Sequence, residues 1–314
     1  MGRGSKIFII AFLISAAVFG LVSFSLVTAL SNMSAPLADP GSLSDGALQS
    51  STGGNSESFN LLIVNVDFRP EAYSYNRARV NALFGNGYSC GVGDDAEIRM
   101  LSAVILRLDR ERGEITFTPV PARAYIKIDG GMSFLASVYE TRGAEALCEQ
   151  VHLLTGLEID EYAVIIPSAA ATIAESVGGL PFDLISSVSA PGEVSVQSGR
   201  KNLTGAEVRT LLLADYEGQS LTREQVASEL SRAFIERLAE GGEARTITLL
   251  KGFLSFIKTS VDADRIDKSA GLIAELYELD RREISLCGKY SGGYFTPDVA
   301  ATIERFQKYR KYYG

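Results

Sequence analysis

Three acidic residues stand close together in a glycine-containing stretch, at Asp94, Asp95 and Glu97. Carboxylate oxygens are the ligands that a hard cation such as Mg²⁺ prefers, so this group is a candidate metal site. Neighbouring acids in such a stretch are also typical of a solvated turn, and the pattern has low specificity. Asp67 is a second candidate ligand because it ends an apolar run, where a carboxylate either binds a ligand or caps a turn.

Two other kinds of catalytic site lack the residues they need. His152 is the only histidine, and it stands within the helix-like stretch EALCEQVHLL. The three cysteines, Cys90, Cys148 and Cys287, form no C-x-x-C pair, and their odd number leaves either one disulfide with one thiol or three thiols. The sequence therefore argues against a histidine-based zinc site and against a Ser-His-Asp triad.

The N-terminus has the properties of a membrane anchor. Residues 7–30 contain no ionisable side chain, and this run is long enough for a helix to cross a bilayer. Arg3 and Lys6 precede it, and positive residues stay on the cytoplasmic side. We therefore expect residues 1–6 in the cytoplasm, a single transmembrane helix over 7–30, and the rest of the chain outside the cell membrane. A cleaved signal peptide, whose apolar region is shorter, is the alternative.

The rest of the chain divides into a linker and a globular part. Residues 31–58 are rich in Ser, Gly, Ala and Pro, a composition typical of a flexible linker, and residues 59–314 are long enough for an extracellular domain. The chain has 38 acidic and 30 basic residues, a net charge of −8. Because binding to nucleic acid depends on basic residues that neutralise phosphates, we expect no nucleic-acid partner.

The globular part alternates strand-like and helix-like segments. Residues 59–68 form an apolar run typical of a buried strand, and residues 101–121 read as a hairpin, with a long loop over 69–98 between them. Further strands are predicted at 125–128, 158–166 and 283–288, and helices at 132–156, 245–261 and 267–279 and after caps at Ser168, Thr204, Thr222 and Thr296 with Pro297. This mixture predicts a three-layer α/β/α domain with a mixed central sheet.

Several of these segments resemble the LytR-CpsA-Psr family of bacterial envelope proteins, over nearly all of residues 59–314. The family's opening strand reads NILLLGxDxR, which NLLIVNVDFR resembles, and its RSDTxMLVSIxPKTKKVxLxSIPRDTYV resembles RMLSAVILRLDRERGEITFTPVPARAYI. Its GxELLxxTVExLLGIPIDHYVxV resembles GAEALCEQVHLLTGLEIDEYAVI, and its LNGEQA resembles LTGAEV. The resemblance implies transfer of a phospho-linked glycopolymer from a polyprenyl-pyrophosphate carrier to peptidoglycan. It also implies an apolar groove for the prenyl tail, and Mg²⁺ and arginines for the pyrophosphate.

The first part of the implied site is partly present. Asp67 falls on the family's metal-binding Asp, and Arg99 on the Arg of its RSD string. Leu101 stands where the family has the Asp of RSD. Ala122 stands where it has the Arg of PRD, with Arg123 one place later.

The second part of the implied site is displaced. Leu213 and Asp215 occupy the positions of the paired arginines in the family's AYVRFR string, and Arg209 lies about one helical turn upstream. Arg223 is the counterpart of the arginines in the family's later GRIxRQQ string. Each lost charge-assisted hydrogen bond removes on the order of 1.5–3 kcal/mol of phosphate binding.

These departures favour a degenerate family member with little or no transferase activity and no cofactor. Its expected partners are a polyprenyl-linked lipid, peptidoglycan or another envelope protein. The alternative is an active Mg²⁺-dependent phosphotransferase, with metal ligands at Asp67, Asp94, Asp95 and Glu97, catalytic arginines at Arg99, Arg123 and Arg223, and ligand-binding arginines at Arg99 and Arg209. A transcription regulator is a third hypothesis, which the acidic charge opposes.

Overall fold

The computed structural model describes residues 58–67, 98–128, 130–217, 219–269, 273, 275–276 and 278–307. They belong to one compact unit, Asn55–Gly314. The predicted anchor, nearly all of the predicted linker and the acidic group at Asp94, Asp95 and Glu97 lie outside the described residues. Within the described ranges, no helix has both the length and the apolar character that crossing a membrane requires.

A six-stranded mixed sheet forms the centre of the domain, in the order β10-β3-β2-β1-β6-β9. Its strands are β1 (Ser58–Asp67), β2 (Arg99–Asp109), β3 (Glu114–Pro121), β6 (Glu161–Ile165), β9 (Lys258–Thr259) and β10 (Asp280–Glu283). β2 runs antiparallel to both β1 and β3, whereas β6 is parallel to β1 and β10 is parallel to β3. The predicted mixed sheet, the opening strand and the hairpin over 101–121 are therefore confirmed.

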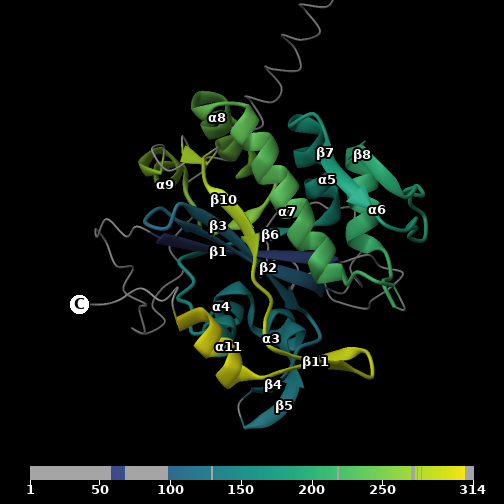
Figure 1. The fold of residues 1–314 in the computed structure, drawn as a ribbon, viewed down its shortest axis with the longest axis vertical. Helices are drawn as coiled ribbons and strands as arrows, with labels where there is room; N and C mark the ends of the chain where they lie inside the picture. The colour runs from purple at the N-terminus through teal and green to yellow at the C-terminus, as the bar shows by residue number, and fades with distance from the viewer. Residues whose placement is uncertain are drawn as a thin grey trace, which may run out of the picture. The chain divides into compact units, whose positions relative to one another are not determined.

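Helices cover both faces of this sheet (Figure 1). On one face lie α3 (Leu135–Arg142), α4 (Ala144–Thr155) and α11 (Val299–Phe306), and on the other lie α5 (Pro167–Ser176), α6 (Gly205–Leu213), α7 (Arg223–Glu240), α8 (Glu243–Phe253) and α9 (Ala263–Lys268). Successive side chains of a strand point to opposite faces. Accordingly, Leu62 and Val64 of β1 enter the core on the α4 side, while Leu61 and Ile63 pack on the α7 side.

Three two-stranded sheets complete the described fold. They pair β4 (Tyr125–Ile128) with β5 (Gly131–Phe134), β7 (Leu180–Leu184) with β8 (Gly199–Leu203), and β11 (Gly288–Ser291) with β12 (Tyr294–Pro297). A bridge between Ala124 and Phe295 joins the first of these sheets to the third, although more than 150 positions separate the two residues in the sequence.

The predicted caps at Thr204 and Thr222 are confirmed. Each threonine hydroxyl accepts a hydrogen bond from the backbone N–H three residues later, and the side-chain oxygen of Glu207 or Gln225 accepts one from the threonine's own N–H. Both are capping boxes, which satisfy backbone groups that the first helical turn leaves without partners. Gly156 also ends α4 in the left-handed conformation, as expected for a helix stop.

Other predicted boundaries are wrong. The segment 132–156 is not one helix. Its first residues, 132–134, belong to β5, and Gly143, with a φ of 87°, separates α3 from α4. Ser168 does not cap α5, since Pro167 occupies the first turn after Ile166. The helix predicted over 245–261 ends at Phe253.

The C-terminal boundaries also differ from the prediction. Within the predicted strand 283–288, Glu283 ends β10 and Gly288 begins β11, and residues 284–287 form the connection between them. Thr296 and Pro297 belong to β12 instead of opening a helix. Asp298 caps α11, because its side chain accepts a hydrogen bond from the N–H of Ala301.

Candidate functional site

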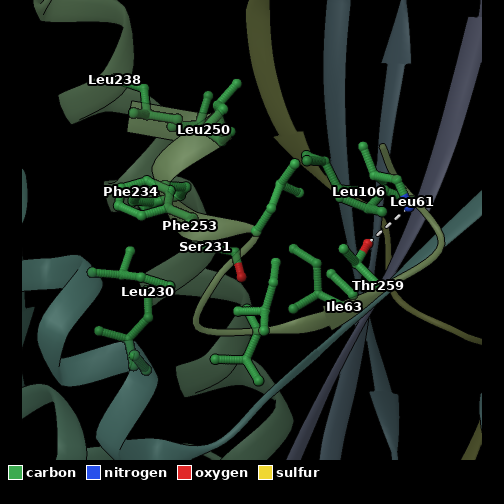
Figure 2. A pocket seen from close by; sticks show the side chains of 18 of the residues that line it. Leu61, Ile63, Leu106, Leu230, Ser231, Phe234, Leu238, Leu250, Phe253 and Thr259 are labelled. Atoms are coloured by element: carbon green, nitrogen blue, oxygen red, sulfur yellow. Dashed lines mark hydrogen bonds between the residues drawn. The ribbon is translucent and has the colours of Figure 1, made fainter. Parts of the chain in front are cut away.

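A cavity of about 250 Å³ lies between the central sheet and the helices α7 and α8. Leu61, Ile63, Leu106 and Thr259 face it from the strands (Figure 2). From the helices it is lined by Leu230, Ser231, Phe234, Leu238, Leu250 and Phe253, among others. The lining is almost entirely hydrocarbon, so the cavity suits an apolar ligand.

The walls of the cavity follow from two periodicities. Every second residue of β1 from Phe59 to Asn65 lines it, which is the strand period. On α7 the lining residues recur three or four positions apart, which is the helix period. The rings of Phe234 and Phe253, whose centroids are 5.8 Å apart, pack α7 against α8. The family resemblance implied an apolar groove, but the sequence pattern could not identify its lining residues, because an apolar face gives the same pattern beside a cavity as within a filled core.

Asp67 and Arg99 lie together where these strands end. They are partners in the β1–β2 register, so they extend from the same face of the sheet. Asp67 follows Asn65 by two positions, which places it on the face that lines the cavity. Asp67 is buried, with 4% of its surface exposed, whereas Arg99 is exposed.

Leu101 sits beside this pair at a β-bulge. The register shifts between Asn65 and Val66, which leaves Leu101 as an extra residue on β2. Its side chain is 5% exposed and belongs to the core cluster on the α7 side. The position where the resemblance implies a second metal-binding Asp is therefore an apolar core position.

Arg123 lies at the same edge of the sheet but turns toward the β4–β5 hairpin. β1 and β3 run in the same direction, so the segment after Pro121 and the end of β1 share one edge. The guanidinium of Arg123 lies 5.3 Å from the centre of the Phe134 ring. The backbone carbonyl of Arg123 accepts a hydrogen bond from the N–H of Phe295. Ala122, beside it, is buried in the opposite core cluster.

Arg223 connects two helices. Its Nε and Nη2 donate to the carbonyl of Ala214, at 3.3 and 2.8 Å, which joins the end of α6 to the start of α7. The next residue, Glu224, accepts a hydrogen bond from the hydroxyl of Tyr290 on β11. Burial and the Glu224 charge raise the pKa of Tyr290, so this phenol stays protonated.

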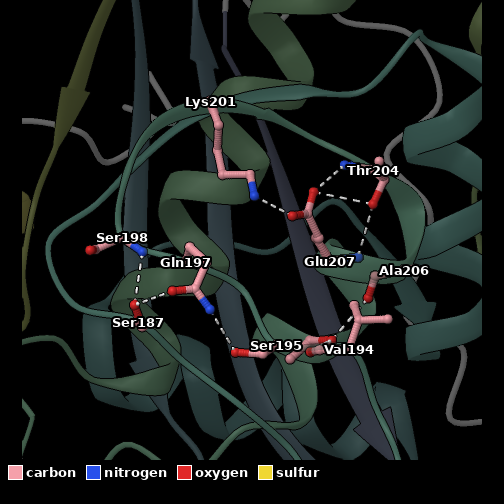
Figure 3. Close-up of polar contacts among 10 residues, drawn as sticks. Ser187, Val194, Ser195, Gln197, Ser198, Lys201, Thr204, Ala206 and Glu207 are labelled. Atoms are coloured by element: carbon pink, nitrogen blue, oxygen red, sulfur yellow. Dashed lines mark hydrogen bonds and ion pairs between the residues drawn. The ribbon is translucent and has the colours of Figure 1, made fainter.

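Arg209 is engaged in a different contact. Its Nη2 lies 2.9 Å from Oε1 of Glu193, in the connection between β7 and β8. Figure 3 shows the neighbouring polar contacts of α6, where Glu207 pairs with Lys201 and with Thr204. Leu213 is buried and Asp215 is exposed after the end of α6, so neither takes the place of a phosphate-binding arginine.

Of the predicted metal ligands, only Asp67 falls within the described residues. In the ranges that the structure describes, no group of three or more His, Cys, Asp or Glu side chains is arranged to hold a metal ion. Asp67 contributes one carboxylate, and Leu101 contributes no oxygen ligand. The described residues therefore supply one carboxylate here, and substrate phosphates or waters would complete any Mg²⁺ coordination. The described cysteines, Cys148 and Cys287, are both free thiols.

Solved structures of similar fold include the Tag proteins TagV and TagT and a protein described as a transcriptional regulator. TagV of B. subtilis matches with a TM-score of 0.59 at 16% identity, over 81% of this chain and 95% of that chain. TagT bound to LIIa-WTA matches with a TM-score of 0.57 at 16% identity, over 81% and 89%. A protein of Enterococcus faecalis described as a transcriptional regulator matches with a TM-score of 0.59 at 16% identity, over 80% and 87%. At these identities the likeness concerns the fold.

Sequence comparison gives the family. A probable cell wall biosynthesis protein of Corynebacterium glutamicum, LcpB, is 28% identical over 187 residues, which are 57% of this chain and 43% of that protein. The match thus spans less than half the length of that relative. The model of the LytR_cpsA_psr family matches residues 25–212, which is more than half of the chain. The chain therefore belongs to the LytR-CpsA-Psr family, as its sequence motifs predicted.

Proposed function

We propose that this protein binds a polyprenyl-phosphate-linked precursor in cell-wall glycopolymer assembly, with little or no transferase activity of its own. The observation that carries the proposal is the apolar cavity between the sheet and α7, with the Asp67–Arg99 pair at the end of the strands that line it. Part of an isoprenoid tail occupies the cavity, and Arg99 receives the phosphate.

The size and the lining of the cavity support an apolar occupant. Its volume of about 250 Å³ is lined almost entirely by apolar side chains. Burying an isoprenoid tail against these walls removes apolar surface from water, which contributes roughly 25 cal/mol per Å². The tail suits the walls, because it is a branched hydrocarbon like the side chains that line them.

The arrangement of the arginines supports weak or absent transfer. Arg223 donates to the carbonyl of Ala214, and Arg209 pairs with Glu193. Arg123 stacks on Phe134 on the side away from the cavity. Transfer of a pyrophosphate-linked polymer needs several cations that stabilise the developing charge. Among the described arginines, Arg99 is exposed on the cavity face of the sheet, and Arg265 of α9, which lines the cavity, pairs with Glu161.

The setting of this function is proposed from the relatives. LcpB is described as a probable cell wall biosynthesis protein, and TagT was solved bound to LIIa-WTA. We extend this setting to the present chain as a membrane-anchored extracellular protein whose partners are a polyprenyl-linked lipid and peptidoglycan. A transcription regulator is not favoured, because the chain carries a net charge of −8.

The second candidate function is an active Mg²⁺-dependent transferase. Asp67 on the cavity face of the sheet favours it, since Mg²⁺ is often held by one or two carboxylates together with substrate phosphates. Asp94 and Asp95 are the further ligands that this function requires.

A turnover assay separates the two functions. The full chain in detergent is incubated with Mg²⁺, a polyprenyl-pyrophosphate-linked glycan and peptidoglycan, and both bound lipid and transferred glycan are measured. We expect the lipid to bind and the glycan to stay on its carrier. Mg²⁺-dependent transfer that Asp67→Asn and Arg99→Ala abolish would establish the transferase instead, and absence of lipid binding would refute both functions.

A further inference from the structure

The β4–β5 hairpin presents an aromatic and basic face on the outside of the domain. Ile126 and Ile128 point inward and pack with the core cluster on the α4 side. Tyr125 and Lys127 alternate with them, so they point outward. Their register partners, Phe134 and Met132, extend from the same outer face. Met132 is 52% exposed, which is unusual for a large apolar side chain.

The β11–β12 hairpin extends this face. The ring of Tyr294 lies 5.5 Å from that of Tyr125 and 6.2 Å from that of Phe134, measured between centroids. In the register, Lys289 pairs with Thr296, two positions from Tyr294, so Lys289 extends from the same side as Tyr294. We call this surface the hairpin face and define it by Tyr125, Lys127, Met132, Phe134, Lys289 and Tyr294.

The hairpin face is basic on an acidic protein. Lys127 and Lys289 are both exposed, and Arg123 at its border lies over the ring of Phe134. The structure describes every outward-facing strand position of the two hairpins. None of these positions holds an acidic residue. The whole chain carries a net charge of −8, so the sign of this face is opposite to the average.

We propose that the hairpin face docks the domain onto an anionic phospholipid membrane. Tyrosine and other rings with an apolar body and a polar tip gather at the membrane–water interface, and lysines beside them are attracted to anionic headgroups. Met132 inserts among the upper acyl chains, while Lys127 and Lys289 stay at the level of the headgroups. This contact is additional to the predicted N-terminal anchor and fixes how the domain faces the bilayer.

The geometry favours a membrane over a glycan chain as the occupant. The three rings are tilted 54–58° to one another, so they present no common flat surface on which sugar rings could stack. Met132, at the exposed end of the hairpin, carries no group that hydrogen-bonds to hydroxyls well. A disordered hydrocarbon surface accepts tilted rings and a methionine equally.

A tryptophan reporter tests the proposal, because the chain contains no tryptophan. Met132→Trp places a unique fluorophore on the hairpin face, and Ile185→Trp places one at a site that is 71% exposed after β7, as the matched control. Both full-length variants are reconstituted in vesicles that contain anionic phospholipid with brominated acyl chains. We expect blue-shifted, bromine-quenched emission from Met132→Trp and water-exposed emission from Ile185→Trp.

Two further sets of variants complete the fluorescence experiment: a charge reversal on the hairpin face and a substitution that fills the cavity. Each lysine contributes about a fivefold factor to association with an anionic surface, so Lys127→Glu with Lys289→Glu should remove most of the quenching. Ser231→Phe, which fills the cavity, should leave it unchanged, so this test is independent of the lipid-binding proposal. Emission from Met132→Trp that matches the control overturns membrane docking. So does a blue shift without bromine quenching, which indicates a protein cover, or shielding that appears only with added peptidoglycan.

Discussion

Asp67 and Arg99 stand opposite each other across β1 and β2, although residues 68–98 separate them in the sequence. Their strands line the apolar cavity, and both residues extend from the cavity face at one edge of the sheet. The carboxylate of Asp67 and the guanidinium of Arg99 are therefore charged groups beside an apolar cavity. An amphipathic lipid with a charged head requires that combination.

Replacing Arg99 should weaken binding of the charged lipid head only. We expect Arg99→Ala to lower the affinity for polyprenyl phosphate by about tenfold, because one charge-assisted hydrogen bond of about 1.5 kcal/mol is lost. The affinity for uncharged polyprenol should not change. Competition binding with the two lipids measures both, and Arg245→Ala on the exposed side of α8 is the control. An equal loss for both lipids would show that Arg99 acts on the fold.

Replacing Arg223 should affect stability instead of binding. Arg223→Ala removes both hydrogen bonds to the Ala214 carbonyl, so the free energy of unfolding should fall by about 1–3 kcal/mol. Urea denaturation measures this change, and the affinity for polyprenyl phosphate should stay within error of the unmodified protein. If affinity falls while stability is kept, Arg223 binds the ligand, as the family resemblance implies.

The capping box of α6 should make stability depend on pH. Burial of Glu207 opposes its ionisation, but hydrogen bonds from Lys201 and Thr204 outweigh burial and lower the pKa of the carboxyl. Because the folded pKa lies below the unfolded value of about 4.3, the stabilisation is complete above that pH and is lost as the pH falls through the folded pKa.

Glu207→Gln tests this dependence. Glutamine preserves the capping box, as Gln225 does on α7, but it removes the charge that pairs with Lys201. We expect the variant to be less stable than the unmodified protein at neutral pH, and the difference to shrink as the pH falls below about 4. Urea midpoints across this range measure the difference. A constant difference at every pH would mean that the Lys201–Glu207 ion pair contributes nothing.

Sequence patterns predicted the parts of the fold that local physics determines. The apolar run over 59–68 predicted β1, and Thr204 and Thr222 cap helices through their own hydroxyls. Gly143 was missed as a break because the apolar spacing continues through it, whereas the backbone turns there at a φ of 87°. Ser168 was a plausible cap, but Pro167 is better suited to the first helical turn.

The candidate site was less predictable because its contacts join distant segments. The family pattern indicated Asp67 and Arg99, and their pairing required the β1–β2 register. Arg223 donates to the carbonyl of Ala214, and Arg209 pairs with Glu193. Both contacts depend on how α6 packs against its neighbours. The cavity itself is a mismatch between two packed faces, which no single segment of sequence encodes.

The central claim is that the cavity holds the lipid, and one matched pair of variants tests it most directly. Ser231 faces the cavity from α7 and donates to the carbonyl four residues earlier, at 2.8 Å. Thr248 makes the same kind of bond, at 2.9 Å, from an exposed position on α8. Ser231→Phe fills the cavity with a ring, whereas Thr248→Phe adds the same ring outside it.

The measurement is the affinity of each full-length variant for polyprenyl phosphate in detergent. The account predicts that Ser231→Phe binds at least about tenfold more weakly, a loss of about 1.4 kcal/mol, while Thr248→Phe binds like the unmodified protein. The thermal stability of Ser231→Phe should be unchanged or raised, since it fills an apolar space. Equal affinity in the two variants, with both folded, would contradict lipid binding in the cavity.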